Sequence, residues 1–239
     1  MSENLVIIPT YNEKENIAKI IAAVLELPRT FNILVVDDGS PDGTANIIKD
    51  LQKDKPGLHL LQRTGKQGLG TAYIAGFKWG LDHGYDHIFE MDADFSHNPA
   101  DLVRLLEALE RGADLVVGSR YCKGGKVKNW PWDRILLSYG ASIYTRLITW
   151  MPVKDPTAGF IGYRRKVLEA IPLDRIKFIG YAFQIEMKFS AYRLGFKIVE
   201  VPITFIDRVE GVSKLSSGII HEAVFGVIKM RLNMKLGQG

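Results

Sequence analysis

The chain has 239 residues, 46% hydrophobic and 24% charged, a balance typical of a globular protein and not of a disordered one. Its formal net charge of +4 suits an anionic ligand or an acidic membrane surface and does not by itself indicate a nucleic-acid partner. The single cysteine, Cys122, cannot form an internal disulfide, and the chain shows neither a signal peptide nor an apolar run of bilayer length. We therefore expect a cytoplasmic protein.

Strand and helix patterns alternate through the first half of the chain. Continuous apolar runs predict buried strands at residues 5–8, 33–36, 58–61, 88–91 and 115–117. Helical spacing of apolar residues predicts helices between them, at 13–27, 42–53, 69–83 and 99–111. This alternation indicates an α/β fold in which helices cover both faces of a mostly parallel sheet and ligands bind at the carboxyl ends of its strands.

The second half of the chain is less regular. Its pattern predicts a basic, aromatic loop at 119–134, a helix at 135–150, a turn and short strand within 155–165, a helix at 181–194 and a strand at 198–206. The tail from Ile219 to Leu236 has a narrow polar strip on an otherwise apolar helical pattern. We predict one domain over residues 1–215 and an amphipathic helix over 216–239, which either packs on the domain or a partner chain or binds a lipid interface.

Polar clusters follow three of the predicted strands, at PTYNE (9–13), DDGSPDGT (37–44) and DAD (92–94). Because parallel strands end at the same edge of a sheet, one site explains the three clusters more simply than coincidence does. In extended structure Asp92 and Asp94 point the same way, and their charges repel unless a cation lies between them. An isolated Asp-x-Asp is more often a surface turn, but this context favours a site for Mg²⁺ or Mn²⁺ that also binds phosphate.

Familiar alternatives lack their motifs. The glycines at 65, 68 and 70 do not have the dinucleotide-binding spacing, TGKQ is not a P-loop, and His221-Glu222 lacks the second histidine of a metalloprotease. Stacking and hydrogen-bonding groups that suit a nucleoside are Tyr11, Glu13, Asp37 and Asp38. Cationic side chains that suit phosphate groups are Lys66, Arg120, Arg134, Arg208 and Lys214.

Seven segments together resemble the polyprenol-phosphate (dolichol-phosphate) mannosyltransferases of glycosyltransferase family 2. In chain order, between about residues 5 and 215, they read IIPTYNEKENI, VVDDGSPDGT, RTGKQGLGTAY, MDADFSHNP, VGSRY, GYAFQIEM and EVPITFIDRVEGVSK. The resemblance implies a GT-A fold, a three-layer α/β sandwich. It also implies metal-dependent, inverting transfer of mannose from GDP-mannose to polyprenyl or dolichyl phosphate. Many relatives carry carboxyl-terminal membrane spans, and the sequence through residue 239 contains none.

The resemblance also assigns roles to individual residues. It implies a donor site formed by Pro9, Tyr11, Glu13, Val36, Asp38, Asp92, Ala93 and Arg208, and metal ligands Asp92, Asp94 and Ser96. It places Arg120, Arg134 and Ser138 at the acceptor phosphate and makes Asp94, Arg120 and Arg208 the catalytic residues. Gln184 to Glu186 stand where relatives that glycosylate hydroxyl groups carry an acidic pair, so we assign no general base and expect Glu186 to organise the site.

Two other functions fit parts of this pattern. A polyprenol-phosphate glucosyltransferase using UDP-glucose is the nearer one, because sequence motifs distinguish phosphates better than sugars or bases. A non-catalytic sugar-nucleotide-binding subunit is the other, and the presence of Asp94, Arg120 and Arg134 argues against it.

A basic, aromatic segment offers a route to the lipid acceptor. Trp130 and Trp132 lie beside Lys123, Lys126 and Lys128, and amphipathic aromatic residues near basic ones are typical of the membrane interface. We therefore expect peripheral association with the cytoplasmic face of a membrane through this segment and the tail. A small membrane-anchored partner subunit is the alternative means of delivery.

Overall fold

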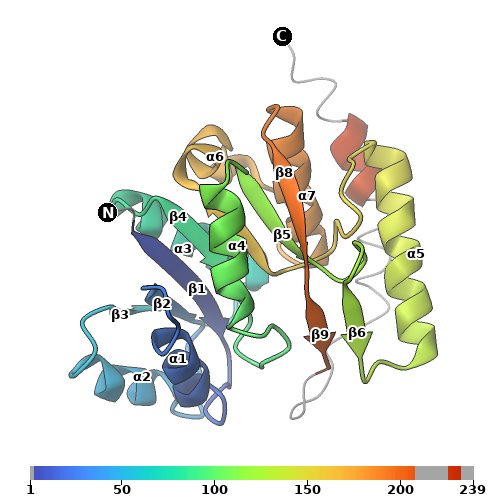
Figure 1. The fold of residues 1–239 in the computed structure, drawn as a ribbon. Helices are drawn as coiled ribbons and strands as arrows, with labels where there is room; N and C mark the ends of the chain where they lie inside the picture. Colours follow the sequence, from blue (N-terminus) through green and yellow to red (C-terminus); the bar gives the residue numbers. More distant parts are fainter. Residues whose placement is uncertain (1–2, 208–225, 233–239) are drawn as a thin grey trace.

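A seven-stranded sheet forms the centre of the fold in the computed structural model, which describes residues 3–207 and 226–232 (Figure 1). In the order β3-β2-β1-β4-β7-β5-β8, its strands are Leu58–Gln62, Asn32–Asp37, Asn4–Thr10, His87–Glu90, Ile161–Arg164, Leu115–Ser119 and Ile198–Pro202. β7 runs antiparallel to both neighbours, and the other pairs are parallel. The sequence-based prediction of a mostly parallel sheet is confirmed.

Helices cover both faces of the sheet, as the unbroken apolar runs of its strands require (Figure 1). One layer contains α1 (Ile17–Leu25), α2 (Thr44–Gln52) and α4 (Asp101–Glu110), and the other contains α3 (Leu69–Asp82), α6 (Arg165–Ala170) and α7 (Tyr181–Arg193). Successive residues of β1 point to opposite layers, so Leu5 joins the core beneath α3 whereas Val6 joins the core beneath α1. A 3₁₀ turn, η1 (Leu173–Arg175), connects α6 to the segment before α7.

A second, two-stranded sheet joins the segment 119–134, which we expected to be a loop, to the end of the predicted strand 198–206, which divides into β8 and β9. Here β6 (Lys126–Lys128) pairs in parallel with β9 (Thr204–Ile206), and α5 (Trp132–Thr149) begins three residues earlier than predicted. α5 stands at the margin of the molecule beside the helical residues 226–232 (Figure 1). Within residues 3–207 and 226–232, no helix combines the length and the apolar composition that a bilayer span would need.

One side of the described part of the tail, residues 226–232, packs against the domain, as one of the two predicted alternatives requires. Val227 and Met230 are buried against residues of α7, whereas Ile228 and Leu232 are exposed. The remainder of the predicted 216–239 helix lies outside the described residues, so its amphipathic character stays a prediction.

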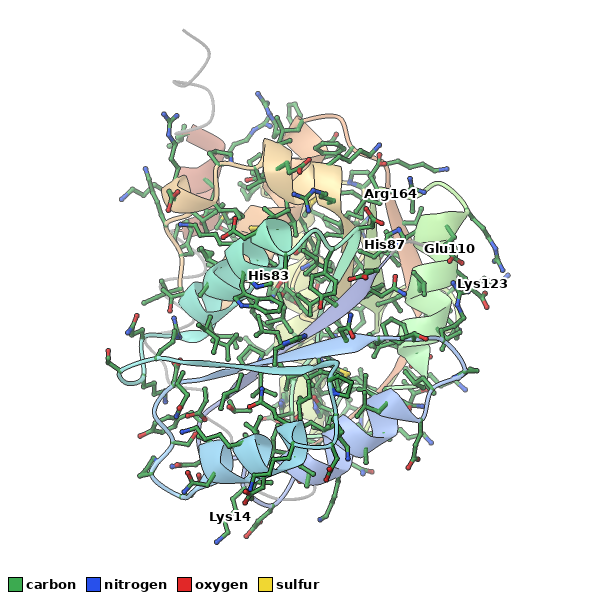
Figure 2. The ribbon with its side chains drawn as sticks, turned by 90° about the vertical axis from the view of Figure 1, so that its left-hand side faces the viewer. Lys14, His83, His87, Glu110, Lys123 and Arg164 are labelled. Carbon is green, nitrogen blue, oxygen red and sulfur yellow. The ribbon has the colours of Figure 1, made fainter. Side chains whose placement is uncertain are left out.

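The two ends of the parallel strands carry different groups of side chains (Figure 2). His87, the first residue of β4, lies near Glu110 and Arg164 at the edge where the parallel strands begin. Lys14, which follows β1, lies at the other end, where the parallel strands finish. Between β1 and β4 the strand order reverses, and such a switch point at the carboxyl edge is where α/β sheets bind ligands.

Candidate functional site

Two aspartates at the end of β2 are held in fixed orientations. Asp37 accepts hydrogen bonds from Thr10 Oγ1 (2.9 Å) and from the Ser40 amide (3.0 Å). Asp38 accepts from Arg63 Nε (2.6 Å) and from the Gln67 amide (3.2 Å). Sequence reasoning did not single out Arg63, although it is the first residue after β3 and so belongs to the same edge.

The end of β1 and the segment that follows it lie across from these aspartates. Pro9 pairs in register with Val36, and the Glu13 amide donates to Thr44 Oγ1 (3.1 Å) at the start of α2. The ammonium group of Lys66 lies 5.2 Å from the centre of the Tyr11 ring. The predicted nucleoside residues of β1 and β2 therefore lie at one edge, although the buried Val36 side chain limits that residue to main-chain contacts.

The segment that carries Asp92 and Asp94 is bent, so our expectation of two side chains aligned on an extended strand is wrong. β4 ends at Glu90, and Phe95 has a positive φ of 59°. Asp94 accepts a hydrogen bond from the Ser96 amide (3.0 Å), and the Tyr73 hydroxyl donates to Asp92 (3.4 Å). Both carboxylates are half-buried at the switch point.

This segment suits a metal that is partly coordinated by substrate. Among the described residues, no three His, Cys, Asp or Glu side chains gather into a closed metal site. Asp92, Asp94 and the buried Ser96 supply two carboxylates and one hydroxyl, all hard oxygen ligands. Mg²⁺ commonly takes one or two carboxylates and completes its shell with water and substrate phosphates, so this donor set fits such an ion.

His97 lies behind the two carboxylates and was not assigned from the sequence. Its Nδ1 accepts a hydrogen bond from the Asp92 amide (3.3 Å), and its ring stacks on Phe160 at 4.9 Å and meets the Phe205 ring edge-on at 5.5 Å. Burial, together with the nearby Arg120 charge, lowers the pKa of His97 to about 4, although the Asp94 charge acts against this shift. A neutral imidazole therefore separates the carboxylate segment from the arginine-containing part of the site.

Arg120 follows β5 and is almost completely buried. Its Nε and Nη2 donate to the two oxygens of Asp155 (2.8 and 2.7 Å), and Nη2 also donates to Thr157 Oγ1 (2.8 Å). Burial opposes ionisation of Asp155, but the Arg120 charge and hydrogen bonds outweigh it and lower the pKa of Asp155. The guanidinium group is thus locked in one orientation by a buried carboxylate.

Arg120, Arg134, Ser138 and Trp130 form a cluster that we call the arginine clamp. The guanidinium carbons of Arg120 and Arg134 lie 5.5 and 4.2 Å from the centre of the Trp130 ring. Arg134 donates from Nη1 to both oxygens of Asp207 (2.9 and 2.8 Å). Trp130 is half-buried between the arginines, so it does not have the exposure of the membrane anchor that we expected, whereas Trp132 is 83% exposed.

Ser138 joins the clamp through a tyrosine. Tyr121, next to Arg120 in the chain, donates its hydroxyl proton to Ser138 Oγ (2.7 Å), one turn beyond Arg134 on α5. The structure therefore brings together the three predicted acceptor residues. Arg208 and Lys214 lie outside the described residues, so their assignments stay predictions.

Two glutamates, Glu90 and Glu186, are each held by two hydrogen bonds. Glu90 is fully buried and accepts hydrogen bonds from the Tyr163 hydroxyl (2.7 Å) and from Gln184 Nε2. Burial raises the pKa of Glu90 to about 7, although these hydrogen bonds act against the rise. Glu186 accepts from the amides of Lys177 and Phe178 (2.9 and 3.0 Å) and so fixes the segment before α7, and its expected role in organising the site stays a prediction.

Comparison with known proteins gives a consistent picture. Residues 5–171 match glycosyl transferase family 2. The chain is 50% identical over 233 residues to the polyprenol monophosphomannose synthase of Mycolicibacterium smegmatis, covering 97% of this chain and 88% of the other. It is also 50% identical over 228 residues to the undecaprenyl-phosphate mannosyltransferase of Micrococcus luteus, covering 95% and 93%.

A solved structure shares the architecture. The mannosyltransferase of Pyrobaculum calidifontis in complex with GDP-Man and Mn²⁺ has a TM-score of 0.61 and 18% identity, over 99% of this chain and 65% of that one. At this identity the likeness shows the fold alone, and the predicted GT-A class is confirmed.

Proposed function

This chain belongs to glycosyl transferase family 2, and we propose that it transfers mannose from GDP-mannose to the phosphate group of a polyprenyl phosphate with inversion at the anomeric carbon. The observation that carries this proposal is the arginine clamp next to the nucleotide edge. The two relatives of 50% identity, whose names specify transfer of mannose to polyprenol-type carriers, support the choice of sugar and acceptor.

The nucleotide edge suits the donor. Tyr11 offers an aromatic face, and the fixed carboxylate of Asp38 offers hydrogen-bond acceptors for the base or ribose. Asp92 and Asp94, with Ser96, would hold Mg²⁺ or Mn²⁺. Such an ion would stabilise the negative charge that develops on the leaving diphosphate.

The arginine clamp suits an acceptor phosphate rather than a hydroxyl. A phosphate monoester is largely ionised at neutral pH because its second pKa is about 6, so it needs positioning more than deprotonation. The carboxylates that touch the clamp, Asp155 and Asp207, each pair with an arginine, an arrangement that does not suit a general base. The acceptor oxygen bonds to the anomeric carbon as the bond from that carbon to the diphosphate breaks, and GDP leaves.

We also propose that α5 places the clamp at a membrane surface. Trp132, Leu136, Leu147 and Trp150 are 83%, 70%, 69% and 72% exposed, at spacings of four, eleven and three residues along the helix and its cap. Apolar side chains at such spacings share a face of a helix. An exposed apolar face of this extent favours a lipid surface or another apolar partner.

Lipid is the partner that fits the rest of the site. Arg134 and Ser138 of the clamp lie on the inward side of α5, opposite the exposed apolar face, so a membrane against that face would hold a lipid phosphate about one helix diameter, ~10 Å, from them. The exposed Lys123, Lys126 and Lys128 lie before the helix and suit anionic headgroups. This surface differs from the expected one, since α5 and Trp132 replace Trp130 as the main contact.

Turnover with purified full-length protein tests the proposal. The reaction contains a short-chain polyprenyl phosphate, Mn²⁺ or Mg²⁺, and labelled GDP-mannose or UDP-glucose in parallel. We expect the mannosyl lipid from GDP-mannose and no product from the matching polyprenol without phosphate. Preference for UDP-glucose would establish the glucosyltransferase alternative, and binding of donor without turnover would establish a non-catalytic subunit.

A further inference from the structure

Lys188 of α7 is a buried cation to which the reaction described above gives no role. Its side chain is completely buried, and Nζ donates hydrogen bonds to three carbonyl oxygens, those of Pro156 (3.1 Å), Ala158 (2.6 Å) and Gln184 (3.0 Å). An ammonium group has three donors and no acceptor, so these three acceptors match its protonated form. A neutral amine has two donors and would leave one buried carbonyl facing a lone pair.

Two of these carbonyls belong to the turn that orients Arg120. The turn at 155–158 carries Asp155 and Thr157, which together accept all the side-chain hydrogen bonds described above for Arg120. On its other side the turn is held by Glu200 of β8, whose carboxylate accepts from the Lys154 and Asp155 amides (2.9 and 3.0 Å). The turn is therefore fixed by one buried cation and one carboxylate.

We propose that Lys188 is a positioning residue for the acceptor site: its ammonium group fixes the 155–158 turn, and the turn fixes Arg120 toward the acceptor phosphate. The proposal rests on the proposed function only for the identity of the acceptor. Lys188 acts on the clamp through the main chain of the turn, because its hydrogen bonds go to the carbonyls of Pro156 and Ala158, which alternate in the chain with Asp155 and Thr157.

The proposal predicts a pH dependence. Burial lowers the pKa of Lys188 to about 7; Arg120 lowers it too, whereas Glu90, Asp155 and Glu200 raise it. As pH rises through 7, Lys188 loses its proton, so one of the three carbonyl oxygens that it contacts loses its hydrogen-bond donor. The 155–158 turn, and with it Arg120, is then held less firmly. The acceptor KM should therefore increase as the pH is raised beyond 7. Ionisation of the acceptor has the opposite effect on KM, because it improves binding as the pH rises through about 6.

The test compares Lys188→Met with Lys166→Met, which makes the same chemical change at an exposed site on α6. We expect Lys188→Met to raise the acceptor KM by about tenfold, as loss of an orienting partner commonly does, with the GDP-mannose KM unchanged. Its acceptor KM should also lose the rise above pH 7, and Lys166→Met should behave as the wild type. Equal increases in both KM values, or no change in either, would overturn the proposal.

A spectroscopic measurement makes the test independent of turnover. The Arg120 Nε–H resonance, assigned in ¹⁵N spectra with Arg120→Lys, reports whether its hydrogen bond to Asp155 persists. We expect protection from exchange in the wild type below pH 7, and loss of protection above pH 7 and in Lys188→Met. If Lys188→Met does not fold, the wild-type pH series decides, and a protected resonance up to pH 9 refutes the proposal. If the wild type lacks transferase activity, the proposed function fails while this resonance still tests Lys188.

Discussion

Replacement of Arg134 should weaken binding of the acceptor phosphate and leave binding of the donor unchanged. In the structure, Arg134 binds Asp207 through two hydrogen bonds, and an acceptor phosphate must take over part of that interaction. A charge-assisted hydrogen bond contributes about 1.5–3 kcal/mol, and a partly exposed ion pair such as this one contributes about 0.2–1 kcal/mol. The net loss in Arg134→Ala is then about 0.5–2.8 kcal/mol, which corresponds to a rise of about 2–100-fold in acceptor KM.

The assay uses a short, water-soluble polyprenyl phosphate so that membrane binding does not affect KM. We expect Arg134→Ala to leave the GDP-mannose KM unchanged. Asp207→Asn should lower the acceptor KM by about two- to fivefold, because it weakens the competing ion pair. Arg146→Ala, which removes an exposed arginine from the same helix, is the matched control and should have no effect. A donor-specific effect of Arg134→Ala, or a higher acceptor KM in Asp207→Asn, would refute the reasoning.

Three further predictions address the metal, the buried ion pair and the membrane face. Asp94→Ala should abolish transfer with an unchanged circular dichroism spectrum, and full activity of this variant after EDTA treatment would exclude the metal assignment. Asp155→Asn leaves a buried guanidinium without its charge partner and should lower the urea-derived free energy of unfolding by about 3–5 kcal/mol; a change below 1 kcal/mol would contradict the buried pair. Trp132→Ser/Leu147→Ser should reduce salt-sensitive co-sedimentation with anionic liposomes, whereas Leu25→Ser, which changes an exposed apolar residue of α1, should not. Equal binding by the wild type and both variants would exclude α5 as the contact.

The location of the site followed from the sequence because it depends on local patterns. Continuous apolar runs such as Leu5 to Ile8 indicate strands buried on both faces, and parallel strands finish at one edge. The polar residues directly after those runs, among them Asp38 and Asp94, therefore had to lie at that edge. The family resemblance supplied residue roles that periodicity alone does not contain.

Tertiary structure alone decided how the clamp is supported. β7 inserts antiparallel between β4 and β5, which brings the 155–158 turn beneath Arg120, 35 residues from Asp155 in the chain. Lys188 reaches the same turn from α7, and Trp130 contacts both clamp arginines and the ring of Phe205 on β9. Hydrophobic periodicity reports which side of one element is buried, whereas these contacts depend on which elements become neighbours. For that reason the sequence by itself predicted a candidate site at the carboxyl end of a parallel sheet, and only the folded chain showed which buried charges hold the arginine clamp in place.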